Sequence, residues 1–167
     1  MPCDAHAHPF DLAERFPGAE EDRRRLGVVC AASAWNRREF LAQEAMSRVA
    51  AASRGPALLL CFGVHPQLPA VPPAAGAHED SWNTLEELAA GKRLAAVGEA
   101  GFDLFDDRFR ATEALQDELF DRQLDLALAA GLPMVLHVRR GMHKVFARSR
   151  RLAKLPGVLL HSYSGTL

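Results

Sequence analysis

The sequence predicts an α/β protein with a (β/α) barrel of the TIM type, incomplete, with about six of the eight strands present. Apolar runs recur without the alternation of a half-solvated strand, as in parallel strands covered on both faces. Stretches with helical spacing of apolar residues separate these runs. Metal-ligating residue types stand at the C-terminal ends of successive runs, and a barrel gathers those ends at one mouth, whereas an open sheet spreads them along an edge.

The predicted elements alternate in chain order. The first helix follows Asn36, because Glu39 stands three residues later in a capping pattern and Gly55 ends the apolar face. A Pro/Ala-rich stretch, residues 68–77, is predicted to be a surface loop near the mouth. The six candidate strands are residues 1–5, 27–32, 57–64, 94–97, 132–138 and 158–160.

Three more helices complete the alternation. Ser81 begins a short helix that closes at Gly91. Thr112 is the expected cap of a longer helix that ends at Gly131, where a glycine can take the left-handed conformation. Residues 141–154 are predicted to form the last helix.

Composition and charge exclude several classes of protein. The 167 residues are 49% hydrophobic and 25% charged, which excludes a disordered chain. Because 20 Lys and Arg face 21 Asp and Glu, no overall field attracts nucleic acid or a membrane, and any phosphate affinity must be local. No apolar stretch approaches the roughly 20 residues of a membrane span. Residues 1–4 do not resemble a signal peptide, so we expect a cytoplasmic protein with no membrane partner.

The cysteines and tryptophans are predicted to be packing residues. Cys3, Cys30 and Cys61 are odd in number and far apart, which fits neither a disulfide framework nor a zinc knuckle. We expect them to be reduced and buried. Trp35 and Trp82 are better explained by packing than by stacking on nucleic-acid bases.

The length predicts one domain over residues 1–167 that lacks its C-terminal βα units. A complete barrel of this type takes about 250 residues and eight strands. An open wall of six strands exposes unpaired parallel edges, so we expect the chain alone to be poorly soluble or oligomeric.

A set of histidines and one glutamate predicts a metal site. His6 and His8 are two apart on a strand, so both imidazoles point to one face. Glu99 follows the fourth run between two glycines that would let the backbone turn tightly beside a ligand, and His137 and His161 end apolar runs. Each feature alone is more often a solvated or hydrogen-bonded side chain, but five donors at one end of four strands indicate a metal centre. Imidazole and carboxylate without thiolate suit Zn, Mn, Co, Fe or Mg, and predict hydrolysis by metal-activated water.

These motifs resemble the TatD-like metal-dependent hydrolases, a family that is related to the amidohydrolases and contains deoxyribonucleases. The resemblance implies a deoxyribonuclease or phosphodiesterase acting on DNA or a small phosphoester, and leaves the oligomeric state open. The matching segments are DAHAH at 4–8, FGVHP at 62–66, VGEAGFD at 97–103, residues 116–124 and 133–139, and HSYSG at 161–165.

The resemblance also implies how two divalent ions (Mg²⁺, Mn²⁺ or Zn²⁺) are held. The histidine pair His6 and His8 binds one ion with Glu99, and Glu99 binds the second with His137 and His161. Family members carry a further aspartate after a later strand, and no residue here corresponds to it. The catalytic residue is therefore unassigned, and we expect weak metal retention and little turnover from this chain.

Four side chains around the centre are further candidates. His65 either contacts substrate phosphate or makes a structural hydrogen bond in its His-Pro turn, and both interpretations stay open. Arg139 can bind phosphate with its fork of donors. Asp4 and Asp103 are expected to orient ligand histidines from behind. The basic residues of 139–154 are expected to form mostly a solvated helix face.

Two alternative functions compete with the nuclease. The same metals can hydrolyse an amide, lactone or phosphotriester, as in amidohydrolases that use a carboxylated lysine, but Lys92, Lys144 and Lys154 do not stand at strand ends. The missing aspartate also fits a degenerate, non-catalytic protein.

Overall fold

The protein forms one curved parallel sheet with helices outside it. The structure is a computed structural model that describes residues 1–71 and 77–161. The strands pair in the order β1-β2-β3-β4-β5-β6, each parallel to its neighbour. They are β1 Cys3–Ala7, β2 Val29–Ala34, β3 Leu58–Phe62, β4 Ala96–Asp103, β5 Met134–Arg139 and β6 Val158–His161.

The sheet curves far enough to bring its two edge strands together. His6 of β1 and His161 of β6 lie at opposite ends of the strand order, yet their rings stack with centroids 4.1 Å apart. A flat sheet would separate these strands by about five strand spacings of roughly 4.8 Å each. The incomplete (β/α) barrel predicted from the sequence is therefore confirmed.

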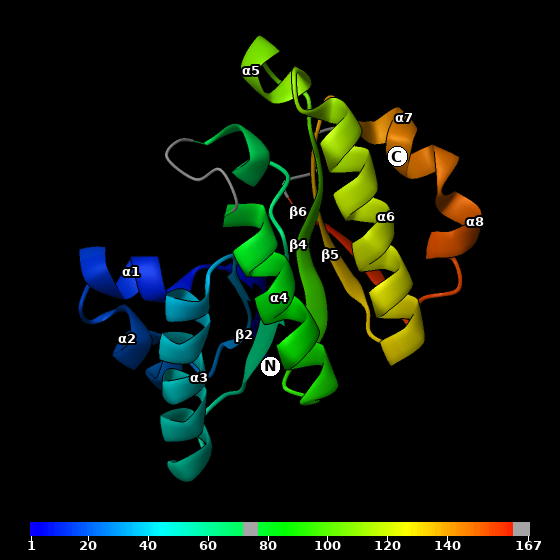
Figure 1. Ribbon diagram of the computed structural model, residues 1–167. Helices are drawn as coiled ribbons and strands as arrows, with labels where there is room; N and C mark the ends of the chain where they lie inside the picture. The colour runs from blue at the N-terminus through cyan, green and yellow to red at the C-terminus, as the bar shows by residue number, and fades with distance from the viewer. Residues whose placement is uncertain (72–76, 162–167) are drawn as a thin grey trace.

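Helices of very different length connect the strands. The helix α3 packs on β2 and β3, and α6 packs on β4, so the connections lie outside the curved sheet (Figure 1). The helices are α1 Pro9–Arg15, α2 Ala19–Arg25, α3 Arg37–Ala52, the short 3₁₀ helix η1 Leu68–Ala70, α4 Ala77–Ala90, α5 Asp107–Arg110, α6 Glu113–Ala130, α7 Met142–Ala147 and α8 Ser149–Leu152.

The predicted helix ends are confirmed at two of three caps. The Asn36 side chain accepts a hydrogen bond from the Glu39 backbone N–H at 2.9 Å and begins α3. Gly131, with φ +65°, ends α6. Thr112 precedes α6, but its hydroxyl donates to the Phe109 carbonyl at 2.9 Å instead of capping the helix, because α5 ends immediately before it.

Other helix boundaries differ from the prediction. The helix α4 begins at Ala77, and Ser81 lies buried inside it. The predicted loop 68–77 contains η1, and its residues 72–76 lie outside the described residues. The last helix is two helices, α7 and α8, separated at Arg148. The helices α1, α2 and α5 were not predicted, because they are short and highly charged.

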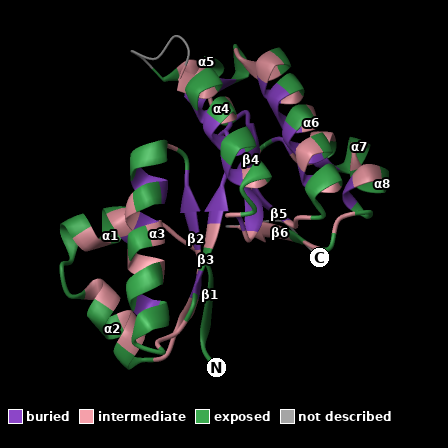
Figure 2. Cartoon of the chain, turned by 60° about the horizontal axis from the view of Figure 1, so that its bottom comes forward, coloured by how far each residue is buried: buried purple, intermediate pink, exposed green. Residues whose placement is uncertain are grey.

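The strand β4 is longer than predicted and places Glu99 inside the sheet rather than beyond a strand end. All of β4 is buried (Figure 2). Gly98 and Gly101 have φ of +148° and +146°, and a Cβ on Gly101 would lie 2.0 Å from the His137 carbonyl oxygen. The glycines beside Glu99 therefore allow β4 to approach β5 closely, and a motif that reads as a turn is a buried strand.

The apolar core between sheet and helices also fixes the strand ends. Phe40, Phe62, Phe102 and Phe120 are among its fully buried side chains. Two buried glutamines of α6 bind the backbone at the mouth: Gln123 binds both N–H and C=O of Val64, and Gln116 does the same for Asp103. These paired hydrogen bonds hold the ends of β3 and β4 at a fixed height.

The predicted burial of cysteines and tryptophans is only partly correct. Cys30 and Cys61 are buried free thiols, but Cys3 is exposed because β1 is an edge strand. Trp82 packs against the main core. The packing prediction is wrong for Trp35, which is 42% exposed. Trp35 directly precedes the cap of α3, where the chain turns at the mouth of the barrel.

The basic segment after β5 is mostly paired rather than solvated. Lys144 and Arg148 bind Asp117 at 2.5 and 2.9 Å, and Arg148 and Arg151 both bind Asp121 at 2.7 Å. The prediction that these basic residues form mostly a solvated face is wrong. Acidic residues spaced by four along α6 face α7 and α8 and pair with them. No described helix is both long enough and apolar enough to cross a lipid bilayer.

Candidate metal centre

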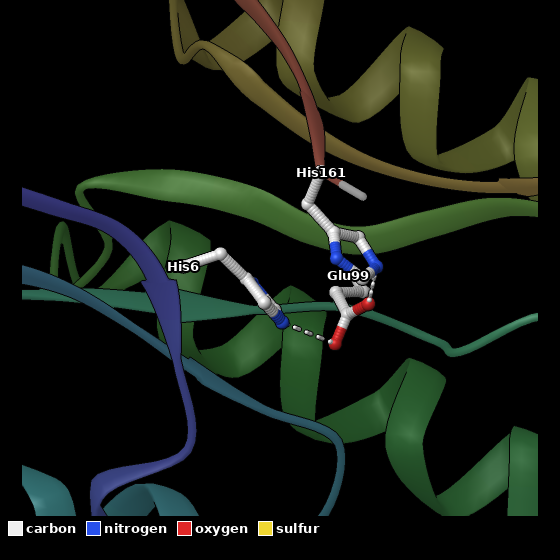
Figure 3. A group of neighbouring side chains, drawn as sticks. All are labelled: His6, Glu99 and His161. Carbon is white, nitrogen blue, oxygen red and sulfur yellow. Dashed lines mark ion pairs between the residues drawn. The ribbon is translucent and has the colours of Figure 1, made fainter. Parts of the chain in front are cut away.

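Glu99 lies at the centre of a cluster of four histidines. Three of them lie on the strands β1, β5 and β6, and the fourth, His8, directly follows β1. The Glu99 side chain is 5% exposed, and its two oxygens face different partners. Oε1 lies 3.2 Å from His6 Nε2 and 3.0 Å from His8 Nε2. Oε2 lies 2.6 Å from His161 Nε2 and 3.4 Å from His137 Nδ1. Figure 3 shows His6 and His161 reaching the carboxylate from opposite edge strands.

The two histidines of the first motif reach Glu99 from different local structures. His6 lies within β1, and its Nδ1 is 3.1 Å from the Ser33 hydroxyl of β2. His8 follows the strand and precedes α1, whose first residue is Pro9. The two rings meet edge to face with centroids 5.0 Å apart. Both predicted imidazoles therefore reach one oxygen of Glu99.

A second buried carboxylate, Glu39, stands behind His8. Its Oε1 lies 3.1 Å from His8 Nδ1, while the Trp35 N–H donates to Oε2 and the Gln43 amide donates to Oε1. Glu39 is 1% exposed. Sequence reasoning treated it only as a capping residue. The feature of the sequence that could have indicated a role for Glu39 at the site is its position in the first turn of a helix that begins at the mouth of the barrel.

The opposite side of Glu99 has the same construction. His137 directs Nδ1 at Glu99 and places Nε2 3.2 Å from Asp103 Oδ2. Asp103 is fully buried and also accepts from the Gln67 amide at 2.6 Å. Each half of the centre therefore consists of an outer carboxylate, an imidazole and the shared Glu99. Asp103 lies behind His137, on the side away from Glu99, which is the kind of position that the sequence predicted for it.

Hydrogen bonds rather than burial decide the charge of these groups. Burial favours a raised pKa for Glu99, but the hydrogen bonds from His137, His161, His6 and His8 outweigh it and hold that pKa far below its usual range. Hydrogen bonds to Glu39 and then to Glu99 raise the pKa of His8 to about 10. The cluster without metal therefore holds protons between its acids and imidazoles.

Asp103 and His65 are shifted for different reasons. Burial acts to raise the pKa of Asp103, but hydrogen bonds from Gln67, the Phe105 backbone and His137, with the charge of Arg139, lower it. Burial lowers the pKa of His65 to about 3, so this imidazole is neutral at pH 7.

His65 lies against the cluster and also makes the hydrogen bond of its turn. Its Nδ1 accepts from the Gln67 N–H at 3.2 Å, and its Nε2 lies 3.8 Å from Glu99 Oε2. Its ring is 4.5 Å from that of His137. Both sequence interpretations of His65 are thus compatible with its position.

The remaining two candidates differ in their contacts. Arg139 donates to Asp103 Oδ2 at 3.2 Å and lies over the Phe105 ring at 4.0 Å, with its side chain 40% exposed. Asp4 is exposed and accepts a hydrogen bond from the His6 backbone N–H at 3.1 Å. This contact is with the backbone of β1 rather than with an imidazole.

The donor set around Glu99 suits a divalent metal ion. Among the described residues, three groups have possible ligand atoms within 4.8 Å of one another: His6, Glu99 and His161; His65, Glu99 and His137; and His8, Asp11 and Glu39. The donors are imidazole nitrogens and carboxylate oxygens, which zinc, manganese and iron accept. Each oxygen of Glu99 has its own imidazole neighbours, His6 and His8 at Oε1 and His137 and His161 at Oε2.

Comparison with known proteins places this geometry in a family. The family profile described as TatD related DNase matches residues 3–167. The chain is 31% identical over 163 residues to the 3'-5' ssDNA/RNA exonuclease TatD of Cronobacter sakazakii, covering 94% of this chain and 59% of that protein. It is 39% identical over 105 residues to the exonuclease of the same name from Edwardsiella piscicida, covering 62% of this chain and 38% of that protein.

A solved structure shows the same fold. The crystal structure of YJJV, a TatD homolog from Escherichia coli K12, matches with a TM-score of 0.71 and 28% sequence identity. The match covers 99% of this chain and 61% of that chain. This chain thus spans less than two thirds of the length of each of these relatives.

Proposed function

Because the chain belongs to the family of TatD related DNases, we propose that it carries the metal centre of a hydrolase that cleaves phosphodiester bonds in nucleic acid. One observation carries the proposal: the two oxygens of Glu99 face two separate sets of imidazoles, at 3.0 to 3.2 Å on one side and 2.6 to 3.4 Å on the other. A carboxylate with such surroundings is suited to bridge two cations.

Two divalent ions would be divided between these sets, with His6 and His8 on one side of Glu99 and His137 and His161 on the other. Bound ions of this kind supply an activated water at neutral pH and positive charge against phosphate oxygens. The number and identity of the ions belong to the proposal. The aspartate typical of the family has no assigned counterpart, so weak metal retention and slow turnover stay predictions.

The carboxylates behind the histidines determine which nitrogen is available. In the neutral imidazole of His8, Nδ1–H donates to Glu39, which leaves the Nε2 lone pair facing the centre. In His137, Nε2–H donates to Asp103 and leaves Nδ1 facing Glu99. Glu39 and Asp103 therefore fix which nitrogen of each histidine faces the centre once the ring is neutral.

His65 has the opposite arrangement and suits substrate better than metal. Its Nδ1 already accepts the Gln67 N–H, so the proton of the neutral ring is on Nε2, which faces the cluster. A protonated Nε2 cannot bind a cation but can donate to a phosphate oxygen. Arg139 donates to Asp103 through Nη1 and has further N–H groups for the same phosphate.

The relatives named as exonucleases for single-stranded DNA and RNA favour a phosphodiester over an amide, lactone or phosphotriester. The single-domain organisation and the cytoplasmic location stay predictions from the sequence. Cell fractionation with an antibody to the chain would test the location, and limited proteolysis would test for one domain.

Metal content and cleavage test the function together. We expect the purified chain, saturated with Mn²⁺ or Zn²⁺, to bind two ions by mass spectrometry and to cleave 5'-labelled single-stranded DNA or RNA. The matched pair of variants is Glu99→Gln at the centre and Glu86→Gln on the exposed surface of α4. Loss of ions and cleavage in the first variant alone supports the proposal, while equal metal content in both variants contradicts it.

A further inference from the structure

A hollow beside the metal centre combines polar and apolar walls. Its volume is about 320 Å³. His8, His65 and Glu99 of the cluster line it together with Trp35, Leu68 and Val71, and Asp11 and Gln67 complete the lining. This volume lies at the small end of the range for small-molecule sites, roughly 300 to 1,000 Å³. A group that occupies the hollow therefore contacts an indole and the proposed metal ligands at once.

Trp35 is held rigidly at its backbone while its side chain stays exposed. Its N–H donates to Glu39 Oε2 at 3.1 Å, and its carbonyl accepts from the Ser81 hydroxyl at 2.9 Å. Both partners are buried, at 1% and 6% exposure, whereas Trp35 is 42% exposed. Because the backbone of Trp35 is already ordered, binding of a flat ligand restricts only the side chain.

The same glutamate ties Trp35 to the metal centre. Glu39 binds the Trp35 backbone with one oxygen and His8 Nδ1 with the other. The backbone position of Trp35 is thus fixed by the carboxylate that also contacts a proposed metal ligand. A flat group stacked on the indole would lie beside the cluster, because Trp35, His8 and Glu99 line one hollow.

The apolar part of the hollow favours a neutral flat group over a phosphate. Trp35, Leu68 and Val71 carry no charge that could hold an anion, and the charged side chains of the lining, His8 and Glu99 among them, belong to the cluster. Arg139 does not line the hollow and instead contacts Asp103. Phosphate is therefore expected at the centre and toward Arg139, and an uncharged aromatic group against Trp35.

We propose that Trp35, with Leu68 and Val71, forms the subsite for one unpaired nucleobase of the nucleic acid whose phosphate lies at the metal centre. The inference rests on the proposed function, because it takes the substrate to be a nucleic acid. Stacking on an indole accepts any base, since every base has an aromatic face. A paired base inside a duplex is stacked on both faces, so the subsite selects single strands or frayed ends.

The two tryptophans of the chain allow a direct test of contact. In a Trp82→Phe background, Trp35 is the only fluorophore of its type. We expect tetrathymidylate to quench its emission with saturation, and an abasic tetranucleotide of equal charge to leave it unchanged. Equal quenching by the two oligonucleotides, or none by either, overturns the inference.

Affinity measured with fluorescein-labelled oligonucleotides provides a second readout. Trp35→Ala is expected to weaken tetrathymidylate binding about 5- to 150-fold and Trp35→Phe much less, with abasic binding unchanged. Phe146→Ala, which removes an exposed aromatic of α7, is the matched control and should have no effect. Equal affinities of the Ala and Phe variants for tetrathymidylate overturn the inference, and the Phe variant keeps this test valid if the Ala variant folds poorly.

The two proposals fail in different measurements. If the chain binds metal and cleaves nucleic acid but Trp35 does not respond to bases, the subsite is wrong and the function stands. If no metal binds and no phosphodiester is cleaved, the function is wrong, and the subsite proposed for its substrate is overturned with it.

Discussion

The two halves of the metal centre use the same construction in different surroundings. On one side His8 lies between Glu99 and Glu39, next to the edge strand β1, with its side chain 32% exposed. On the other side His137 lies between Glu99 and Asp103, inside the sheet, and is 12% exposed. His137 is therefore held on β5 by paired strands on both sides, whereas His8 lies beside an edge strand and depends mainly on Glu39. We therefore expect the cation beside β1 to be bound more weakly.

Replacing Glu99, the carboxylate that both halves share, should weaken cation binding in both halves and so remove the difference in affinity between them. Glu99→Gln removes the negative charge that both proposed cations would need, so cation affinity should fall by at least about 100-fold at both proposed sites. Isothermal titration with Zn²⁺ measures this change against Glu86→Gln. Retention of one high-affinity ion by Glu99→Gln would show that the halves do not share this residue.

Changing the outer carboxylates should separate the halves. Glu39→Gln and Asp103→Asn each remove one acceptor behind a histidine, which typically costs about 10- to 100-fold in metal affinity. We expect Glu39→Gln to weaken one site and Asp103→Asn the other, each leaving its counterpart intact. Titration of both variants with Mn²⁺, followed by electron paramagnetic resonance, distinguishes the sites. Identical loss in both variants would contradict independent halves.

Acidity should affect the edge half more strongly. Since the pKa of His8 is raised to about 10 by Glu39 and Glu99, its proton must leave before a cation binds at pH 7. The same shift stabilises the metal-free fold fully below pH 6.5, and this contribution is lost as pH rises toward 10.

Thermal unfolding of the metal-free chain between pH 6.5 and 10 measures that contribution. His8→Gln should flatten the dependence, while His143→Gln on α7 should retain it. If the unfolding temperature depends on pH equally in His8→Gln and in the wild type, the proton responsible for the dependence belongs to another group.

The smallest expected effect is on the affinity for substrate at the half that contains His137. Arg139→Met removes the positive guanidinium group near Asp103 and should weaken binding of single-stranded DNA several-fold, with a lower salt dependence. Arg150→Met on α8 is the remote control. Fluorescence anisotropy at two salt concentrations measures both, and equal affinities of the two variants would remove Arg139 from the substrate site.

The sequence predicted the barrel and the five clustered donors because apolar runs and chemically unusual residues are local signals. It misplaced Glu99 relative to its strand, since glycines in a strand interior are uncommon and here serve the approach of β4 to β5. It missed the role of Glu39, because the pairing of β1 with β2 is what brings the first turn of α3 beside His8. The exposure of Cys3 and Trp35 depends in the same way on which elements lie opposite them.

The most direct test of a centre bridged by Glu99 is anomalous diffraction from crystals of the chain soaked with Zn²⁺ or Mn²⁺. We predict two peaks on either side of Glu99, about 3.5 to 4 Å apart, one beside His6 and His8 and one beside His137 and His161. A single peak away from Glu99, or two peaks with no ligand in common, would contradict it.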